Sequence, residues 1–163
     1  MELRKHLDSR IIFVGLYVFA LIIYIIYGLQ PAGAVDYDIT ASLNIPSISL
    51  SADVTTLEPI NGKLDTPDTI VGSYSYHSNK TLLIGHSTTV FSKLNEVSLE
   101  DELEYDNNLY RVIAVDFVKK SSVNMNNLLK FEKKDTLVLM TCAGTLLDNG
   151  DATHRLIITA VRK

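Results

Sequence analysis

The apolar residues of the chain fall into one long uninterrupted run and several short ones. The long run, residues 11–29, reads IIFVGLYVFALIIYIIYGL and contains no charged side chain. A helix of that length, at ~1.5 Å per residue, is long enough to cross the ~30 Å hydrocarbon core of a membrane. We therefore expect a transmembrane anchor over residues 11–29, preceded by a cytoplasmic tail at residues 1–10.

The basic residues that flank this run predict its orientation. Three of them lie within residues 1–10, whereas the first basic residue after the run is Lys63. Because basic residues stay on the cytoplasmic side, we expect a cytoplasmic N-terminus and an extracellular remainder. A cleaved signal peptide is the alternative, since Ala32 and Ala34 form an A-x-A-like site. We favour an uncleaved, single-pass anchor in the cell membrane, because the run exceeds the ~7–15 apolar residues of a signal peptide.

Small, polar and turn-forming residues follow the anchor at residues 30–42, a composition typical of a short stalk. Residues 43–163 remain for a folded domain. A segment of this size, about 120 residues, is enough for one domain with one hydrophobic core. The sequence therefore predicts a tail, an anchor, a stalk and a single extracellular domain.

The short apolar runs of this domain have the length and composition of β-strands. Four are rich in β-branched and aromatic residues and give the strongest predictions: 81–85, 109–118, 136–142 and 155–161. Weaker strand patterns lie at 42–48, 52–55 and 102–105. Pro46 places the first of these at a sheet edge or a bulge, because proline cannot donate to a ladder. Many short strands separated by turn residues favour a sandwich or a closed barrel.

Two segments have helical spacing between these strands. Val90, Leu94 and Val97 recur at helical intervals within residues 89–97, and residues 125–131 could form another turn of helix. Residues 143–154, between the last two strong strands, are expected as a loop. The predicted domain is therefore mainly β, with a few short helices.

Charge and cysteine content narrow the class of protein. The formal net charge is −4 and the chain has one cysteine, Cys142. An acidic chain does not fit nucleic-acid binding. A lone cysteine cannot form an internal disulfide, even in the oxidising environment outside the cell. Cys142 is therefore either a small buried core group or a thiol kept for its chemistry.

Three side chains could give this thiol a reaction. Cys142 ends one predicted strand, Arg155 begins the next, and His86 follows the strand at 81–85. A thiol reacts as the thiolate, which a nearby imidazolium or guanidinium favours. A guanidinium can stabilise an oxyanion, and an imidazolium can protonate a leaving amine. Together the three suffice for acyl transfer, although each alone is also compatible with a structural role, such as an ion pair of Arg155 with Asp151.

Metal binding is only weakly indicated. Cys142, His86, His154 and an aspartate lack the close spacing of zinc ligands. The acidic stretches 100–106 and 148–151 match no complete calcium loop, and a solvated face and a turn explain them better. We expect no cofactor, with calcium as a weakly supported alternative.

Several motifs resemble the sortases, the cysteine transpeptidases of bacterial cell surfaces. They are an Asn-Ile-Pro-Ser-Ile strand at 44–48, GHSTTVFSKL at 85–94, Thr-Leu-x-x-x-Thr-Cys at 136–142 and THRLII at 153–158. The resemblance extends to the C-terminus and implies a closed eight-stranded β-barrel. The short segment before residue 43 and the lack of a large insertion before Cys142 resemble a small anchoring-type member.

The resemblance also implies roles for individual residues. Cys142 would be the nucleophile, His86 its acid and base partner, and Arg155 the oxyanion or substrate-positioning group. Thr141 matches the family's threonine before the cysteine and would belong to the substrate-binding site. Ser87 departs from the arginine or threonine that many members carry after the histidine, a difference that concerns recognition more than catalysis.

The implied substrate is a secreted protein with a C-terminal sorting signal like Leu-Pro-x-Thr-Gly. Cys142 would cleave the signal through a thioacyl-enzyme and transfer the acyl group to an amine on cell wall precursor or on another protein. Two alternatives stay open: a non-catalytic, membrane-tethered β-barrel that binds peptide or wall material, and a cysteine peptidase that hydrolyses its acyl-enzyme. The sorting motif and the acceptor amine cannot be inferred from these residues.

Overall fold

The computed structural model describes residues 17–19, 22–23, 36–77, 79–148 and 151–163. Residues 37–163 form one compact unit, and residues 1–36 form a separate one. The predicted tail, most of the predicted anchor and the first half of the predicted stalk lie outside the described residues. Within the described ranges, we find no helix with the length and apolar character needed to span a membrane.

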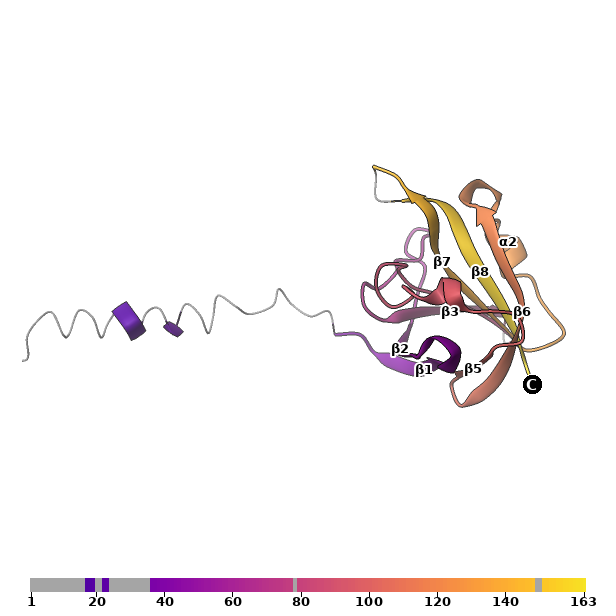
Figure 1. Ribbon diagram of the computed structural model, residues 1–163, viewed down its shortest axis with the longest axis horizontal. Coiled ribbons are helices and arrows are strands. Elements are labelled where there is room, and N and C mark those ends of the chain that lie inside the picture. Colours follow the sequence, from indigo (N-terminus) through magenta and orange to yellow (C-terminus); the bar gives the residue numbers. More distant parts are fainter. Residues whose placement is uncertain (1–16, 20–21, 24–35, 78, 149–150) are drawn as a thin grey trace, which may run out of the picture. The chain divides into compact units, whose positions relative to one another are not determined.

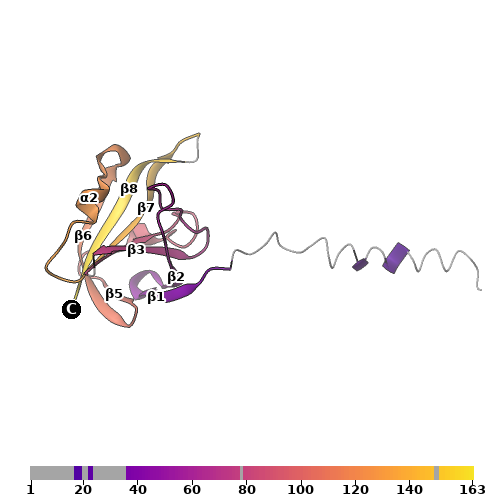
Figure 2. The same ribbon diagram turned by 180° about the vertical axis from the view of Figure 1, so that it is seen from behind.

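Eight strands of the larger unit close into a barrel, which Figure 1 and Figure 2 show from opposite sides. They are β1 (Ile39–Ile45), β2 (Leu50–Thr56), β3 (Val71–His77), β4 (Lys80–Ile84), β5 (Glu102–Tyr105), β6 (Asn108–Lys119), β7 (Thr136–Leu146) and β8 (Ala152–Arg162). Their order around the barrel is β1-β2-β3-β4-β7-β8-β6-β5, and β5 pairs with β1. The β2–β3 and β4–β7 pairs are parallel and the others antiparallel. The predicted closed eight-stranded β-barrel is confirmed.

The described helices of the barrel unit are short. They are the 3-10 turns η1 (Pro46–Ile48), η2 (Leu94–Glu96) and η3 (Lys120–Ser122), and the α-helix α2 (Met125–Leu128). The helical segment predicted over residues 89–97 is helical only in part, at the 3-10 turn η2 (Leu94–Glu96). Most backbone bonds there join residues three apart, and Phe91, Leu94 and Val97 are buried at intervals of three.

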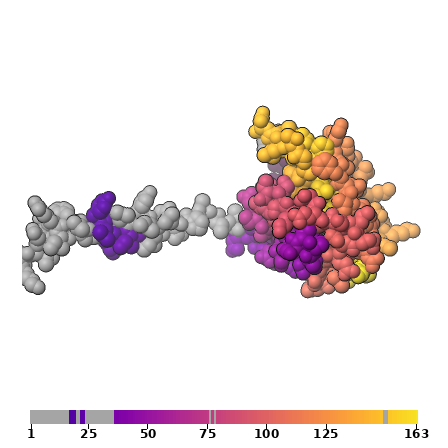
Figure 3. All heavy atoms as spheres, in the orientation of Figure 1, coloured from indigo at the N-terminus to yellow at the C-terminus, as the bar shows by residue number. Residues whose placement is uncertain are grey.

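Other strand boundaries also differ from the prediction. Residues 143–154 are not one loop, because β7 continues to Leu146 and β8 begins at Ala152. β3 was not predicted, and β1 begins at Ile39, so the expected domain boundary at residue 43 falls inside a strand. Figure 3 shows the resulting β7–β8 hairpin, in yellow and orange, at the upper edge of the barrel unit.

Two apolar clusters lie on opposite faces of the barrel wall. Successive side chains of a strand point to opposite faces. On β7, Leu137 and Leu139 belong to the interior core, whereas Val138 belongs to a smaller cluster together with Leu82 and Ile84 of β4. Loop residues 57 and 64 and residues 118–129 contribute to this smaller cluster. The outer face of β4, β7 and β8 is therefore apolar and partly covered, and the groove described below runs along it.

Candidate active site

The parallel pairing of β4 and β7 brings His86 close to Cys142. The last pair in this register joins Ile84 to Met140. His86 and Cys142 each follow that pair by two residues. Because side chains alternate along strands, both point to the same outer face as Ile84 and Met140. Two residues that are 56 positions apart in the chain are thus brought to the same side of the sheet, where β4 ends beside β7.

A buried hydrogen bond fixes this end of the two strands. Thr141 is 5% exposed, and its hydroxyl donates to the backbone carbonyl of Gly85 at 2.7 Å. A Cβ at Gly85 would lie 2.6 Å from Val90 Cγ1 and 2.8 Å from Phe91 Cδ2. Glycine is therefore required at position 85, because the turn that follows His86 packs against the backbone of Gly85. Thr141 acts here by positioning the strand that carries the histidine.

Arg155 lies directly opposite Cys142 in the antiparallel β7–β8 pair. Its side chain is only 14% exposed. One guanidinium nitrogen, Nη1, donates to the carbonyls of Ala152 at 3.0 Å and of His154 at 2.8 Å. The other, Nη2, donates to Asp151 Oδ1 at 2.8 Å. These bonds use three of the five N–H groups of a guanidinium, so two are not bonded to any residue that the structure describes.

Asp151 connects Arg155 to a second cation. Its carboxylate also forms an ion pair with Lys120, which belongs to η3, and accepts a hydrogen bond from the backbone N–H of Ala152. The hydrogen bonds from Lys120 and Arg155 hold the pKa of Asp151 well below its usual range. The carboxylate is thus ionised at neutral pH, and the Arg155–Asp151 pair anticipated from the sequence is present.

His86 is held at the rim of the site by a backbone carbonyl. Its Nε2 lies 3.2 Å from the carbonyl oxygen of Thr66 and 3.8 Å from Asp68 Oδ1. A carbonyl can only accept, so Nε2 carries a hydrogen in this arrangement. The histidine side chain is 42% exposed and Asp68 is 93% exposed, so solvent weakens any attraction between them.

All three predicted catalytic side chains line one groove. Its volume is about 520 Å³, and it includes Cys142, His86 and Arg155 together with Thr141. Its other lining residues include three apolar residues of the outer cluster, a further methionine and two lysines: Leu64, Ile84, Met140, Met125, Lys63 and Lys120. An apolar floor with a few convergent polar groups is typical of a site that binds a peptide or another small ligand. The sequence pointed to Asp151 only as an ion-pair partner of Arg155 and did not point to Lys120, because the contact of Lys120 depends on how the η3 turn packs against the β7–β8 hairpin.

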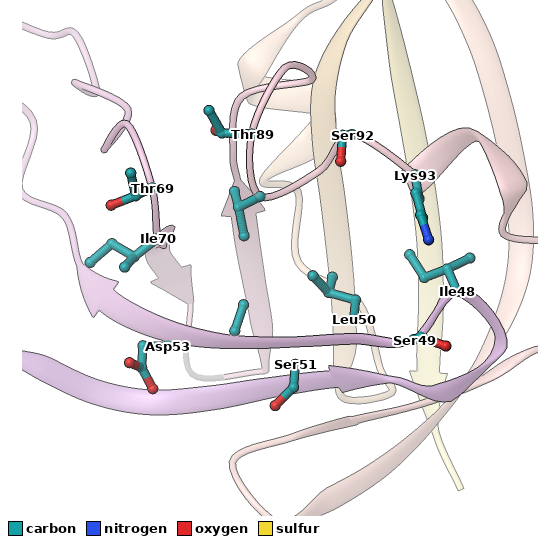
Figure 4. Close-up of a pocket in the computed structure, with 12 residues that line it drawn as sticks. Ile48, Ser49, Leu50, Ser51, Asp53, Thr69, Ile70, Thr89, Ser92 and Lys93 are labelled. Atoms are coloured by element: carbon teal, nitrogen blue, oxygen red, sulfur yellow. The ribbon is translucent and has the colours of Figure 1, made fainter.

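A second large hollow lies away from these residues. Figure 4 shows it between β2 and the segment that follows His86; its volume is about 550 Å³, and it is lined by hydroxyl side chains, Asp53 and Lys93. None of Cys142, His86 and Arg155 lines it. We therefore assign the chemistry to the groove where β4 ends beside β7.

His154 takes no part in the groove. It pairs with Ala143 rather than with Cys142, and its ring stacks on Phe117 at a centroid distance of 4.7 Å. This agrees with the expectation that His154 and Arg155 point to opposite faces. Across the parts of the chain that the structure describes, no three His, Cys, Asp or Glu side chains are grouped so that they could hold a metal ion.

Comparisons with known proteins agree with this fold. A sortase domain model matches residues 43–163. A lid mutant of sortase A from Corynebacterium diphtheriae superposes with a TM-score of 0.62 at 23% identity, covering 83% of this chain and 75% of that one. Sortase C-1 from Actinomyces oris superposes with a TM-score of 0.59 at 26% identity, covering 79% of this chain and 74% of that one. Sortase C1 from Streptococcus agalactiae superposes with a TM-score of 0.60 at 23% identity, covering 80% of this chain and 70% of that one. No curated protein matches the chain.

Because the domain model covers most of the chain, the chain belongs to the sortase family. Members of this family are cysteine transpeptidases of the cell surface, which act on proteins with sorting signals and on amine acceptors. The structural relatives share the barrel with this chain. What they bind is a property of those proteins.

Proposed function

We propose that this protein is a membrane-anchored cysteine transpeptidase that cleaves a C-terminal sorting signal and transfers the new acyl end to an amine. The observation that carries the proposal is the groove in which Cys142, His86 and Arg155 lie together on one face of β4, β7 and β8. The proposed anchor at residues 11–29 would hold this groove at the outer surface of the membrane.

In the first half-reaction, the Cys142 thiolate attacks the threonine carbonyl of a Leu-Pro-x-Thr-Gly-like signal. Two N–H groups of Arg155 are not bonded to any described residue and can donate to the oxyanion as it forms. The C–N bond to the next residue then breaks, and the leaving amine takes a proton from the His86 imidazolium. The product is a thioester on Cys142.

In the second half-reaction, an amine attacks the thioester carbonyl and His86 takes the amine's proton. The C–S bond breaks, the thiolate returns to Cys142 and an amide is released. The apolar floor of the groove supports this assignment, because Ile84, Met140 and Leu64 can bury the leucine and proline of a sorting signal. No cofactor is needed for either step.

Product analysis tests this proposal. The full-length chain in detergent is incubated with a Leu-Pro-x-Thr-Gly peptide library, with and without an added amine. We expect cleavage after threonine and an amide product that appears only with the amine. A product that is always the free acid would indicate a peptidase. A matched pair of variants controls for folding: His86→Gln should abolish cleavage, and His77→Gln, on β3 outside the groove, should preserve it.

A further inference from the structure

Cys142 forms part of two cavities. One is the groove with His86 and Arg155. The other is a smaller hollow of about 330 Å³, which we call the mouth cavity, lined by residues that include Cys142, Ser87, Asn95, Phe117 and Leu156. Among the described residues, only Thr141 and Cys142 contribute to both. Cys142 therefore lies at the boundary between them.

The two cavities open on opposite faces of the β7–β8 hairpin. The groove is lined by Ile84 and Met140, which belong to the outer apolar cluster. The mouth cavity is lined by Phe91 and Leu156, which belong to the interior core of the barrel. A group that approaches Cys142 through the mouth cavity thus arrives from the side opposite to a peptide in the groove.

The mouth cavity has an exposed aromatic wall. Phe117 lies directly opposite Leu156 in the β6–β8 pair, yet its side chain is 61% exposed. Its ring is stacked on His154 at an interplanar angle of 19°. The stack fixes the Phe117 ring, which lines the cavity and can contact a ligand there. Ser87 and Asn95 supply hydrogen-bonding groups at the same cavity.

The charge of the residues that line the mouth cavity also differs from the charge of those that line the groove. Among the described residues that line the mouth cavity, none has a formally charged side chain, whereas the groove has Arg155, Lys63 and Lys120. A partly apolar, uncharged cavity disfavours an ammonium and favours the neutral amine, which is the nucleophilic form. The groove's cations would instead repel an incoming ammonium.

We propose that the mouth cavity binds the amine acceptor, with Phe117 as its specificity-determining residue. The inference rests on the proposed transpeptidase function. The acyl chain fills the groove, and a primary amine at the end of a slender peptide branch enters through the mouth cavity. Its nitrogen lone pair attacks the thioester carbon, its proton passes to His86, and the C–S bond breaks to return the Cys142 thiolate. The cavity volume is at the small end for ligand sites, which fits an amine-bearing side chain or one or two small residues.

The test separates acyl-enzyme formation from its resolution. The full-length chain in detergent is acylated with the best peptide of the library and then offered water, hydroxylamine, Gly-Gly, Ala-Ala or Nα-acetyl-lysine. Two variants alter the cavity: Phe117→Ala removes its wall, and Asn95→Trp fills it from an exposed position. Their controls are Leu109→Ala, an exposed apolar residue on the same strand, and Thr69→Trp, an exposed residue beside the cavity of Figure 4.

We expect wild type to transfer to at least one of the three peptide-like amines. Phe117→Ala should lower the ratio of aminolysis to hydrolysis about tenfold, the size expected for one lost aromatic contact. Asn95→Trp should lower it at least as much, while acyl-enzyme formation and release by hydroxylamine stay within twofold of wild type. The two controls should keep the wild-type ratio.

Three results would overturn the inference. The first is an unchanged ratio of aminolysis to hydrolysis in both cavity variants, and the second is an equal fall of this ratio in the Leu109 and Thr69 controls. The third is a wild type that transfers its acyl group to none of the three peptide-like amines, although hydroxylamine releases that group. Failure of the wild type to form an acyl-enzyme is seen before any amine is added. That result would count against the proposed function itself and would remove the basis of this inference.

Discussion

Cys142 and Arg155 lie directly opposite each other across the β7–β8 pair, although the hairpin end separates them in sequence. Their side chains share the outer face of the hairpin and line one groove. A β-strand register is a rigid constraint, because a slip of one residue would turn either side chain to the other face. The barrel thus determines the relative position of thiol and guanidinium.

Replacing Arg155 should slow acyl-enzyme formation without unfolding the barrel. Arg155→Ala removes both unbonded donors, and loss of an oxyanion donor typically costs about 10²–10³-fold in rate. Arg155→Lys keeps the charge, but one ammonium has three N–H groups and cannot replace all the bonds that the guanidinium makes. Single-turnover kinetics with the library peptide measure the rate of acyl-enzyme formation in both variants. Arg111→Ala, an exposed arginine on β6, is the control and should match wild type.

Asp151 should contribute to stability above the usual titration range of a carboxyl group. Its pKa is lowered by hydrogen bonds from Lys120 and Arg155. A lowered pKa means that its contribution is complete above the unfolded value of ~3.9 and is lost as pH falls through the lower folded value. We therefore expect Asp151→Asn to lower the melting temperature at pH 7, with a difference that disappears in strong acid. A difference that stays constant from pH 7 to pH 2 would contradict this.

The same variant separates a positioning role from a purely structural one. If Asp151 orients Arg155, Asp151→Asn should lower the acylation rate at temperatures where it is fully folded, and Asp151→Glu should restore part of it. Equal acylation rates in all three proteins below their melting temperatures would show that Asp151 only stabilises the hairpin.

Adding one methyl group before His86 should disturb the site. In Gly85→Ala the new Cβ would lie closer than 3.0 Å to Val90 and Phe91, so the turn after His86 must shift. Phe91 is 1% exposed and cannot move outward at little cost. We expect a lower acylation rate and a loss of stability of about 1–3 kcal/mol, as in other overpacked sites. Denaturant unfolding and single-turnover kinetics measure the two effects, and wild-type values in both would refute the steric interpretation.

Tyr110 should make the barrel sensitive to alkali. Its ring is 3% exposed and its hydroxyl donates to Asp135 Oδ2 at 3.2 Å. Burial, with the negative charge of Asp135, raises the pKa of Tyr110 to about 12. A raised pKa gives a contribution that is complete below the unfolded value of ~10 and is lost as pH rises through the folded value. Tyr110→Phe should therefore lose less stability than wild type between pH 9 and pH 12, as followed by far-ultraviolet circular dichroism. A parallel loss in both proteins would exclude this residue as the cause.

The sequence predicted the strands that carry an apolar signal. Apolar or β-branched residues indicated four strands: β4, β6, β7 and β8. The three candidate catalytic residues, Cys142, His86 and Arg155, were then found from the predicted ends of these strands. β3 was missed because its residues, VGSYSYH, include serines that alternate with larger side chains. Ser73 is buried, with its hydroxyl donating to the carbonyl of Thr55, a pairing that depends on the tertiary fold.

The turn after His86 shows a different reason for error. Val90, Leu94 and Val97 fit helical spacing, but Phe91, Leu94 and Val97 also fit a repeat of three. The structure has the repeat of three, because most backbone hydrogen bonds of this segment are of the 3-10 type. The ion pair of Arg155 with Asp151 could be anticipated, because the two residues are close in sequence. The ion pair of Asp151 with Lys120 could not, because Lys120 is distant in sequence.

The most direct measurement is intact-mass spectrometry of the full-length chain with the Leu-Pro-x-Thr-Gly peptide library, on wild type and Cys142→Ala. If Cys142 is the nucleophile, wild type alone gains the mass of a peptide that ends at threonine, and peptide mapping places the adduct on Cys142. A folded wild type that gains no mass with any peptide, or a Cys142→Ala variant that gains the same mass, would contradict the proposed transpeptidase.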